Sequence, residues 1–297
     1  MTTRAQTTEP PPCRICGAAT VPAGTVHGRY SARDYALARC PGCGYGFVAD
    51  PWTDFAAIYD ERYYAGEGAD PMVDYHFELE HPEATVRRYE WSGIARVVGD
   101  LVPSAGPLRW LDYGCGNGGL VRYLNGRTLA DATGFDEGAI TTRARSLGIP
   151  ILTPEELARH EGSFDAITAI EVLEHTLDPV AELRTMRKLL RPGGLLFLTT
   201  GNARPYAARL DRWRYVIPEI HISFFEPRTL ERALSDAGFR PERRSLRPGF
   251  DEILKFKVLK NLGLKRRSAL TDAIPARLPA LADRGPRLSE HPIGWAA

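Results

Sequence analysis

The sequence has almost no net charge and no long apolar run. Of its 297 residues, 38 are Lys or Arg and 37 are Asp or Glu, a formal net charge of +1. Strong non-specific binding to nucleic acid or to a membrane surface usually needs a larger excess of positive charge, so neither is expected. A membrane-spanning helix needs about 18 consecutive apolar residues, and none are found. The N-terminus lacks the apolar segment of a signal peptide, so we expect a cytoplasmic protein whose residues 1–11 form a disordered tail.

Cysteine is also scarce, but its five occurrences follow a pattern. Four of them form two Cys-x-x-Cys pairs: Cys13 with Cys16, and Cys40 with Cys43. Two such pairs supply four thiolates to a Zn²⁺ ion and leave no open coordination position, which is typical of a structural site. A glycine follows each pair and suits the tight turn around the metal. We therefore expect a zinc ribbon over residues 12–48, built on a hairpin, with His27 on its surface rather than on the metal.

Beyond about residue 82, predicted strands and helices alternate. The expected strands cover 108–114, 132–136, 149–152, 164–172 and 195–202, with weaker strands over 240–247 and 250–259. The expected helices cover 83–102, 117–125, 137–148, 154–160, 178–194 and 227–239. Pro192 and Gly193 are expected to end the helix over 178–194. This order is typical of an α/β fold, a doubly wound, mostly parallel, seven-stranded Rossmann-like sheet with helices on both faces.

The chain thus divides into five segments. They are the tail (1–11), the ribbon (12–48), a connector that covers the active site (49–83), the catalytic domain (84–258) and a C-terminal extension (259–297). The connector is rich in tyrosine, a side chain with an apolar face and a polar tip. Tyr63, Tyr64 and Tyr75 are therefore candidates to line a substrate mouth. The alternative is that they only pack the connector against the core.

A glycine-rich stretch, WLDYGCGNGGL (110–120), follows the first strand of the catalytic domain. Gly114, Gly116 and Gly118 let the backbone turn sharply and approach a ligand at the carboxyl end of that strand. NAD binding needs Gly-x-Gly-x-x-Gly instead, and the preceding Asp112 would repel a pyrophosphate. The same carboxylate suits the ammonium group of S-adenosylmethionine (SAM). Asp136 ends the second strand, where it can accept hydrogen bonds from ribose hydroxyls or cap the next helix.

The motifs LDYGCGNGG, GFD, SFDAITAIEVLEH and MRKLLRPGGLLFLTT occur in that order over roughly residues 84–247. They resemble the successive motifs of class I SAM-dependent methyltransferases. The resemblance implies a SAM site made by Asp112, Tyr113, Gly114, Cys115, Gly116, Asp136, Ile170 and Glu171. It gives Cys115 only a backbone contact. A zinc ribbon ahead of such a domain resembles the zinc-containing methyltransferases of bacterial secondary metabolism, which implies a role in antibiotic biosynthesis. The deoxysugar C-methyltransferases among them commonly carry a further C-terminal domain that this chain has no room for.

Candidates for catalysis lie after the fourth strand and in a later loop. The EVLEH stretch supplies Glu171, Glu174 and His175, and EIHISFF supplies Glu219 and His221. Because methyl transfer is a direct displacement, the enzyme mainly aligns the nucleophile and removes its proton. We expect His175 and His221 to act as general base or orienting residue, with Glu171 beside them. EVLEH with a distant histidine also resembles the metal site of ubiquinone-pathway O-methyltransferases and plant small-RNA 2′-O-methyltransferases, which implies a second divalent metal on Glu171, Glu174, His175 and His221.

The expected substrate is a small molecule such as a secondary metabolite or a sugar, methylated on oxygen. C- or N-methylation of a nucleotide-linked sugar is an alternative, and so is a carrier-bound substrate. Basic residues outnumber acidic ones over 240–267, which predicts a solvated face or a phosphate contact. An RNA-modifying enzyme is disfavoured by the near-zero charge, and a silent binding module by the intact glycine loop.

Overall fold

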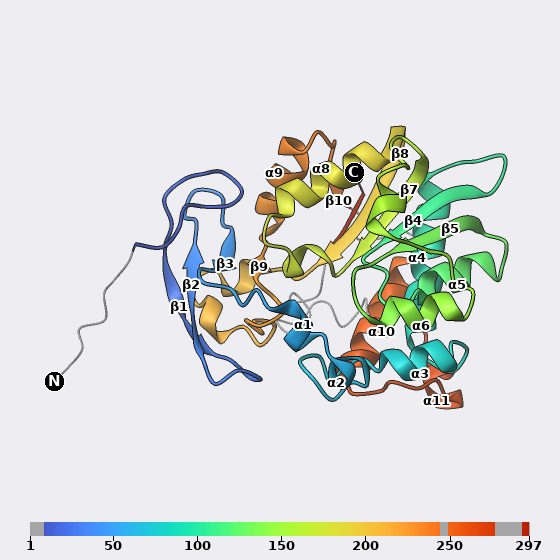
Figure 1. The fold of residues 1–297 in the computed structure, drawn as a ribbon, viewed down its shortest axis with the longest axis horizontal. Helices are drawn as coiled ribbons and strands as arrows, with labels where there is room; N and C mark the ends of the chain where they lie inside the picture. Colours follow the sequence, from blue (N-terminus) through green and yellow to red (C-terminus); the bar gives the residue numbers. More distant parts are fainter. Residues whose placement is uncertain (1–8, 244–248, 277–292, 297) are drawn as a thin grey trace.

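Two β-sheets organise the computed structural model, which describes residues 9–243, 249–276 and 293–296 (Figure 1). Among these residues, seven strands form the larger sheet, in the order β10-β11-β8-β7-β4-β5-β6. Their bounds are β4 Leu108–Tyr113, β5 Ala130–Phe135, β6 Ile151–Leu152, β7 Phe164–Ile170, β8 Leu190–Thr200, β10 Glu242–Arg243 and β11 Ile293–Ala296. The five strands from β8 to β6 run parallel, and β11 is antiparallel to both β8 and β10. The expectation of a mostly parallel, seven-stranded, Rossmann-like sheet is confirmed.

The sheet is buried on both faces, because most side chains of its central strands are apolar on either side. Successive side chains of a strand point to opposite faces. Trp110 of β4 belongs to the core on one face, and the next residue, Leu111, belongs to the core on the other. Leu196 and Phe197 of β8 divide in the same way. Such continuous apolar strands are typical of parallel sheets that helices cover on both sides.

Helices cover both faces, as Figure 1 shows. The helices of the domain are α4 Arg87–Leu101, α5 Gly119–Asn125, α6 Ile140–Ser146, α7 Pro154–Leu157, α8 Pro179–Leu189, α9 Pro227–Asp236, α10 Phe250–Asn261 and α11 Ala269–Ala273. Buried residues of α4, α5 and α10 join the core on the Trp110 face, and those of α8 and α9 join the core on the Leu111 face. The carboxyl ends of the parallel strands are not covered by these helices and continue into loops.

Two sequence expectations are wrong. The weak strand predicted over 250–259 is helix α10, in which Phe250, Ile253 and Phe256 are buried at helical spacing. The prediction was wrong because the lysines at 255 and 257 give the sequence an alternating pattern typical of a strand. The helix predicted over 178–194 ends at Leu189, and Pro192 and Gly193 lie within β8. There the β7–β8 ladder shifts register, so the two residues form an irregularity in a strand rather than a helix end. Strand β10 falls inside the predicted strand 240–247, of which residues 244–247 lie outside the described residues.

The N-terminal segment forms the smaller sheet, in the order β1-β2-β3-β9. Strands β1 Val21–His27 and β2 Asp34–Arg39 make the expected hairpin, and β3 Gly46–Val48 follows the second cysteine pair. The fourth strand, β9 Ser223–Phe224, comes from the catalytic domain. Between β3 and β4 in the sequence, the connector forms three short helices, α1 Phe55–Ile58, α2 Glu61–Tyr64 and α3 Tyr75–Glu80. No helix in the described part of the chain is both long and apolar enough to cross a membrane, and residues 1–8 of the expected tail lie outside that part.

Candidate active site

The glycine-rich loop joins β4 to α5 at the carboxyl end of the sheet. Gly114, Gly116 and Gly118 all have positive φ, at 75°, 54° and 73°. A side chain at Gly114 would also collide with Val172, which explains why the loop needs glycine there. The amide N–H groups of Gly114 and Cys115 donate to the carbonyl of Phe135, at 2.8 and 3.1 Å. The loop is therefore fastened to the end of β5.

Asp112 lies at the end of β4 with only 6% of its surface exposed. Its Oδ1 accepts a hydrogen bond from the Thr168 hydroxyl at 2.8 Å, and that hydroxyl accepts one from the Trp110 indole at 3.0 Å. Burial raises the pKa of Asp112 to about 7, and the nearby Asp136 carboxylate adds to the effect. This buried carboxylate accepts that one hydrogen bond through Oδ1. It is therefore suited to bind a cationic group of a ligand.

Asp136 follows β5 and faces the glycine loop. Its two oxygens accept from the amides of Gly116 and Gly138, at 2.9 and 2.6 Å. Burial raises its pKa, and these two hydrogen bonds oppose that shift. Each oxygen keeps a lone pair for a further donor. The carboxylate thus fixes the shape of the loop and remains able to accept from a ligand diol.

The other residues predicted for the SAM site differ in what they can offer. The Tyr113 hydroxyl points away to α8, where it donates to Glu182 at 2.6 Å, so only its backbone borders the loop. The Cys115 side chain is 9% exposed and packs against Gly134 of β5, so this residue too presents its backbone. Ile170 ends β7 beside β4 and is partly buried. These placements bring the predicted residues to one edge of the sheet.

The three predicted tyrosines lie together over this edge. The rings of Tyr63 and Tyr75 are stacked with centroids 5.7 Å apart, and Tyr64 meets both edge-on. Tyr75 lies against Gly116, and the Tyr64 hydroxyl lies beside Gly138. The connector therefore covers the glycine loop itself. Tyr59, which sequence analysis did not select, extends the cluster, since its ring packs on Tyr63 and its hydroxyl lies 3.0 Å from Nδ1 of His175.

The two predicted histidines meet although 45 residues of sequence separate them. His175 ends the short 3₁₀ helix η1 (Leu173–His175), and its ring centroid lies 4.9 Å from that of His221. Nδ1 of His221 is 2.6 Å from the carbonyl oxygen of Tyr215. A carbonyl only accepts, so Nδ1 carries the proton and Nε2 is left as an acceptor. Burial lowers the pKa of both rings, that of His175 to about 3, so both are neutral at pH 7.

The two glutamates of EVLEH have different surroundings. Glu174 is fully buried and accepts from the hydroxyls of Tyr215 and Thr200, while burial and the charge of Glu171 raise its pKa to about 7. Glu171 has a φ of 57°, rare for a residue other than glycine. Burial alone would raise the pKa of Glu171, but Lys257 and Lys260 lower it to about 2. Its carboxylate lies 3.1 Å from the Lys257 ammonium.

Comparison with known proteins identifies the larger body of the chain. Residues 86–243, just over half of the sequence, match the family described as methyltransferase domain. The chain belongs to this family. The matched residues include the glycine loop, Asp136, the EVLEH stretch and His221, which together occupy the carboxyl edge of the methyltransferase sheet.

Curated relatives of this methyltransferase domain include two bacterial enzymes named ubiquinone biosynthesis O-methyltransferase. The one from Psychrobacter arcticus is 36% identical over 152 residues, which cover 43% of this chain and 58% of that protein. The one from Xanthomonas campestris pv. campestris is 42% identical over 112 residues, which cover 34% and 46%. The chain therefore spans about half the length of the curated relatives it matches.

Solved structures share the fold of this methyltransferase at low sequence identity. One is a chain in the complex between the Haloferax volcanii Trm112 methyltransferase activator and a methyltransferase, with a TM-score of 0.51 and 17% identity. It covers 80% of this chain and 96% of that one. The plantazolicin methyltransferase BamL, in complex with a triazolic desmethylPZN analog and SAH, gives a TM-score of 0.50 at 16% identity and covers 79% of this chain and 92% of that one.

Three of the four predicted ligands for a second metal converge in this methyltransferase. Ligand atoms of Glu174, His175 and His221 all lie within 4.8 Å of one another. Two neutral imidazoles and a carboxylate form a donor set that a divalent ion accepts. Glu171 is not part of this group, because its carboxylate is turned toward Lys257. The trio fits a metal, although both oxygens of Glu174 already have hydrogen-bond donors.

The four cysteines of the ribbon fit a zinc ion more closely. Their sulfur atoms lie within 4.8 Å of one another, with Cys13 3.5 Å from Cys43 and Cys16 3.6 Å from Cys40. Tetrahedral coordination at about 2.3 Å per bond separates neighbouring sulfurs by about 3.8 Å. The glycines after the two pairs have φ values of 70° and 83°, as the predicted turns require. His27 is exposed and paired with Asp34, away from the sulfurs, as expected.

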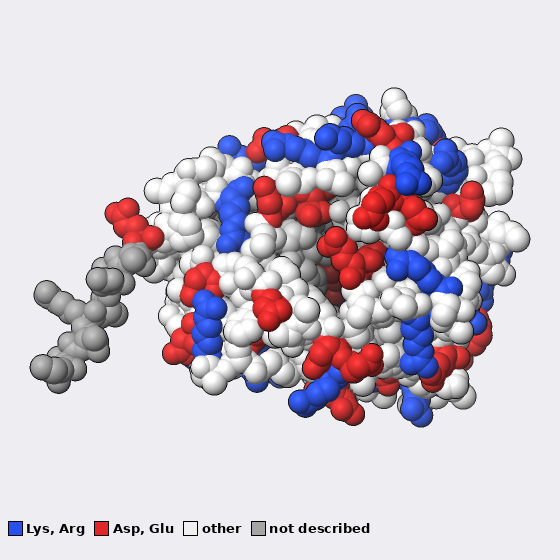
Figure 2. All heavy atoms as spheres, in the orientation of Figure 1, with Lys and Arg blue, Asp and Glu red and all other residues white. Residues whose placement is uncertain are grey.

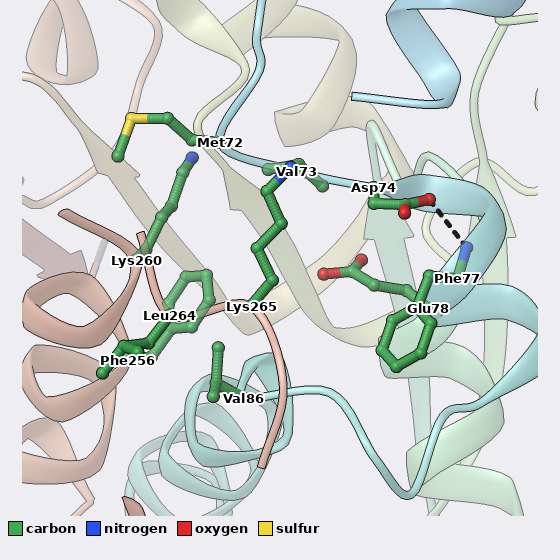
Figure 3. Close-up of a pocket in the computed structure, with 10 residues that line it drawn as sticks. All are labelled: Met72, Val73, Asp74, Phe77, Glu78, Val86, Phe256, Lys260, Leu264 and Lys265. Carbon is green, nitrogen blue, oxygen red and sulfur yellow. Dashed lines mark hydrogen bonds between the residues drawn. The ribbon is translucent and has the colours of Figure 1, made fainter. Parts of the chain in front are cut away.

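The basic segment over 240–267 is only partly a solvated face. Lys255 and Lys257 of α10 are each 4% exposed, which corrects the expectation for these two residues. Figure 2 shows a hollow near the centre of one face with acidic side chains around it. A separate small pocket lies between α3 and α10, where Lys260 extends toward Met72 and Lys265 toward Val73 (Figure 3). The glycine loop does not line this pocket.

Sequence analysis missed several residues that surround the histidine pair and Glu171. They are Tyr59, Asp70, Glu90, Tyr215, Lys257 and Lys260. None belongs to a short motif, and all except Tyr215 reach the site from segments distant in sequence. A lysine amid the apolar residues of 250–259 was the one available sign, because buried lysines need a partner. Because that segment was incorrectly predicted to be a strand, its lysine was not recognised as buried.

Proposed function

We propose that the protein is a SAM-dependent methyltransferase that methylates an oxygen atom of a small molecule. The observation that carries this proposal is the common edge of the sheet. There the glycine loop, Asp112 and Asp136 share one edge with a pair of partly buried, neutral histidines. Relatives named for O-methylation, at 36–42% identity over the matched residues, support oxygen as the acceptor.

The geometry divides the roles within this edge. When bound, SAM supplies an electrophilic methyl group. Asp112 would hold its ammonium, Asp136 its ribose, and the tyrosine cluster would exclude water from above. His221 is the better general base, because Nε2 remains an acceptor while Tyr215 holds Nδ1. His175 is held by the Tyr59 hydroxyl on one side and by the backbone of Ile220 on another, which suits an orienting role.

A His221→Asn variant tests this assignment. The side-chain amide of Asn can still donate a hydrogen bond to the Tyr215 carbonyl. The substitution removes Nε2, the nitrogen that would accept the proton. We expect turnover to fall by about 10²–10⁴-fold, the usual contribution of a general base, with SAM affinity close to that of the wild type. The assay is SAM consumption over a panel of phenols, catechols, hydroxylated sugars and carboxylic acids, with calorimetry for SAM binding. Full turnover in His221→Asn would remove His221 from the mechanism.

Metal-assisted O-methylation is the second candidate, favoured by the convergence of Glu174, His175 and His221. A divalent ion there would bind the acceptor oxygen and lower its pKa. In that case EDTA abolishes activity and Mg²⁺ or Zn²⁺ restores it. Elemental analysis must show that the ribbon keeps its metal during this treatment. A Glu174→Gln variant that keeps full, EDTA-resistant activity would exclude the metal.

A further inference from the structure

The ribbon and the segment that carries His221 share one β-sheet. Strand β9 begins two residues after His221 and pairs antiparallel with β3 of the ribbon, Gly46 with Phe224 and Phe47 with Ser223 (Figure 1). The backbone of Ile222 forms hydrogen bonds with two different segments. Its carbonyl accepts from the amide of Val48 at 3.0 Å, and its own amide donates to the carbonyl of Glu174 at 2.7 Å. One residue thus connects the ribbon with the EVLEH stretch.

A second connection runs through side chains. The hydroxyl of Tyr45, a fully buried ribbon residue, lies 2.6 Å from the hydroxyl of Ser223. The Ser223 hydroxyl in turn lies 2.9 Å from the carbonyl of Thr176, the residue after His175. The ribbon is therefore linked by hydrogen bonds to the backbone beside both histidines.

The third connection is a buried carboxylate. Glu219, two residues before His221, is fully buried. Its Oε1 accepts from the amides of Tyr30 and Ser31, at 3.0 and 3.1 Å, and from the Ser31 hydroxyl at 3.0 Å. All three donors belong to the loop of the ribbon hairpin. A buried acceptor with three donors is costly to displace, so this loop fixes the position of residue 219.

We propose that the ribbon is a positioning part of the active site, in which Glu219 and the loop over residues 28–33 hold His221 opposite His175. This inference rests on the proposed catalytic role of His221. It differs from a ribbon that only adds stability, because the contacts converge on a nine-residue segment, 217–225, with the histidine at its centre. A displacement of about 1 Å at a reacting group can cost up to about 10²-fold in rate.

Gly28→Ala tests the proposal from the ribbon side. A methyl group at Gly28 would lie within 3.0 Å of Glu219 Oε1 and of the Ser31 hydroxyl, while the φ of this residue is one that alanine adopts freely. The methyl group would also lie 2.7 Å from the carbonyl oxygen of Ser31, so the substitution displaces the hairpin loop and its contact with Glu219. His27→Ala is the matched control, because His27 is exposed and bonds to Asp34 of the same hairpin. Glu219→Ala disrupts the same contact from the other side, and Glu219→Gln keeps the accepting oxygen.

Three quantities are measured for each variant, after metal content and circular dichroism confirm folding. They are kcat at saturating substrate, SAM affinity, and hydrogen–deuterium exchange of residues 217–225. Gly28→Ala and Glu219→Ala should lower kcat by about 10–10²-fold, with SAM affinity within about twofold of wild type and with faster exchange. Glu219→Gln should restore most of kcat, and His27→Ala should match the wild type.

Two results would overturn the proposal. One is wild-type exchange in residues 217–225 of both disruptive variants. The other is faster exchange with unchanged kcat while His221→Asn is inactive. If His221→Asn is itself fully active, the proposed role of His221 fails, whereas the exchange data still decide whether the ribbon holds the segment.

Discussion

Replacing Lys257 with methionine should strongly destabilise the protein, because the Lys257 ammonium neutralises one buried and one partly buried carboxylate. It lies 2.9 Å from Glu90 and 3.1 Å from Glu171, and the exposed fractions of the three side chains are 6%, 1% and 24%. Methionine keeps the length of the side chain and removes the charge. Glu90 retains Arg87 at 3.2 Å, but Glu171 loses its ion-pair partner.

The magnitude follows from the pKa of Glu171. A shift from 4.5 to about 2 corresponds to roughly 3 kcal/mol at neutral pH, and removing one partner of a buried ion pair typically costs about 3–5 kcal/mol. In the wild type the lowered pKa makes this stability fully present above about pH 4.5, and it is lost as the pH falls toward 2. Without Lys257, burial is opposed mainly by Lys260, so the pKa of Glu171 rises from its wild-type value and the variant loses stability relative to the wild type as the pH rises.

The assay is chemical denaturation followed by circular dichroism at several values between pH 4.5 and 8. The gap between wild type and Lys257→Met should widen with pH, and a second substitution, Glu171→Gln, should recover part of it. Lys188→Met on the exposed side of α8 is the control. A loss below about 1 kcal/mol at pH 7, or no recovery in the double variant, would show that the buried pair does not carry this energy.

Three further predictions concern binding. SAM affinity should be constant above about pH 7 and fall up to about tenfold per pH unit below it, because protonation of Asp112 removes the partner of the SAM ammonium; calorimetry should find this dependence absent in Asp112→Asn. Asp136→Ala should weaken SAM binding by about 1.5–3 kcal/mol, and unchanged affinity would remove it from the site. Elemental analysis should find one zinc per chain in protein purified without chelator, and none in Cys40→Ser.

Local patterns were enough to predict most of the sheet. The strand β4 with its glycine loop, the strand ends at Asp136 and Ile170, and the ribbon hairpin are each encoded by a few adjacent residues. The helix α10 was missed because lysines at 255 and 257, which normally indicate exposure, are buried here by long-range partners. Burial of this kind depends on contacts that no local pattern contains.

The site was predicted in outline for the same reason. Motif spacing placed His175 and His221 on one edge, and the structure brings their rings together. It did not indicate that Glu171 is held by Lys257, because that contact depends on how α10 packs. It also did not predict that the ribbon gains a fourth strand from residues Ser223–Phe224, since a two-residue strand has no periodicity to detect.

The shared sheet also constrains how the protein can be synthesised. The ribbon leaves the ribosome first, but β3 has an unpaired edge until Ser223–Phe224 have been made. At a rate of synthesis of about 5–20 residues per second, the edge of β3 stays unpaired for roughly 10–35 s until β9 has been made. An exposed strand edge is a template for pairing with other chains. Truncations that end before β9 should therefore aggregate, and the same truncations with Phe47 replaced by lysine should remain monomeric for longer.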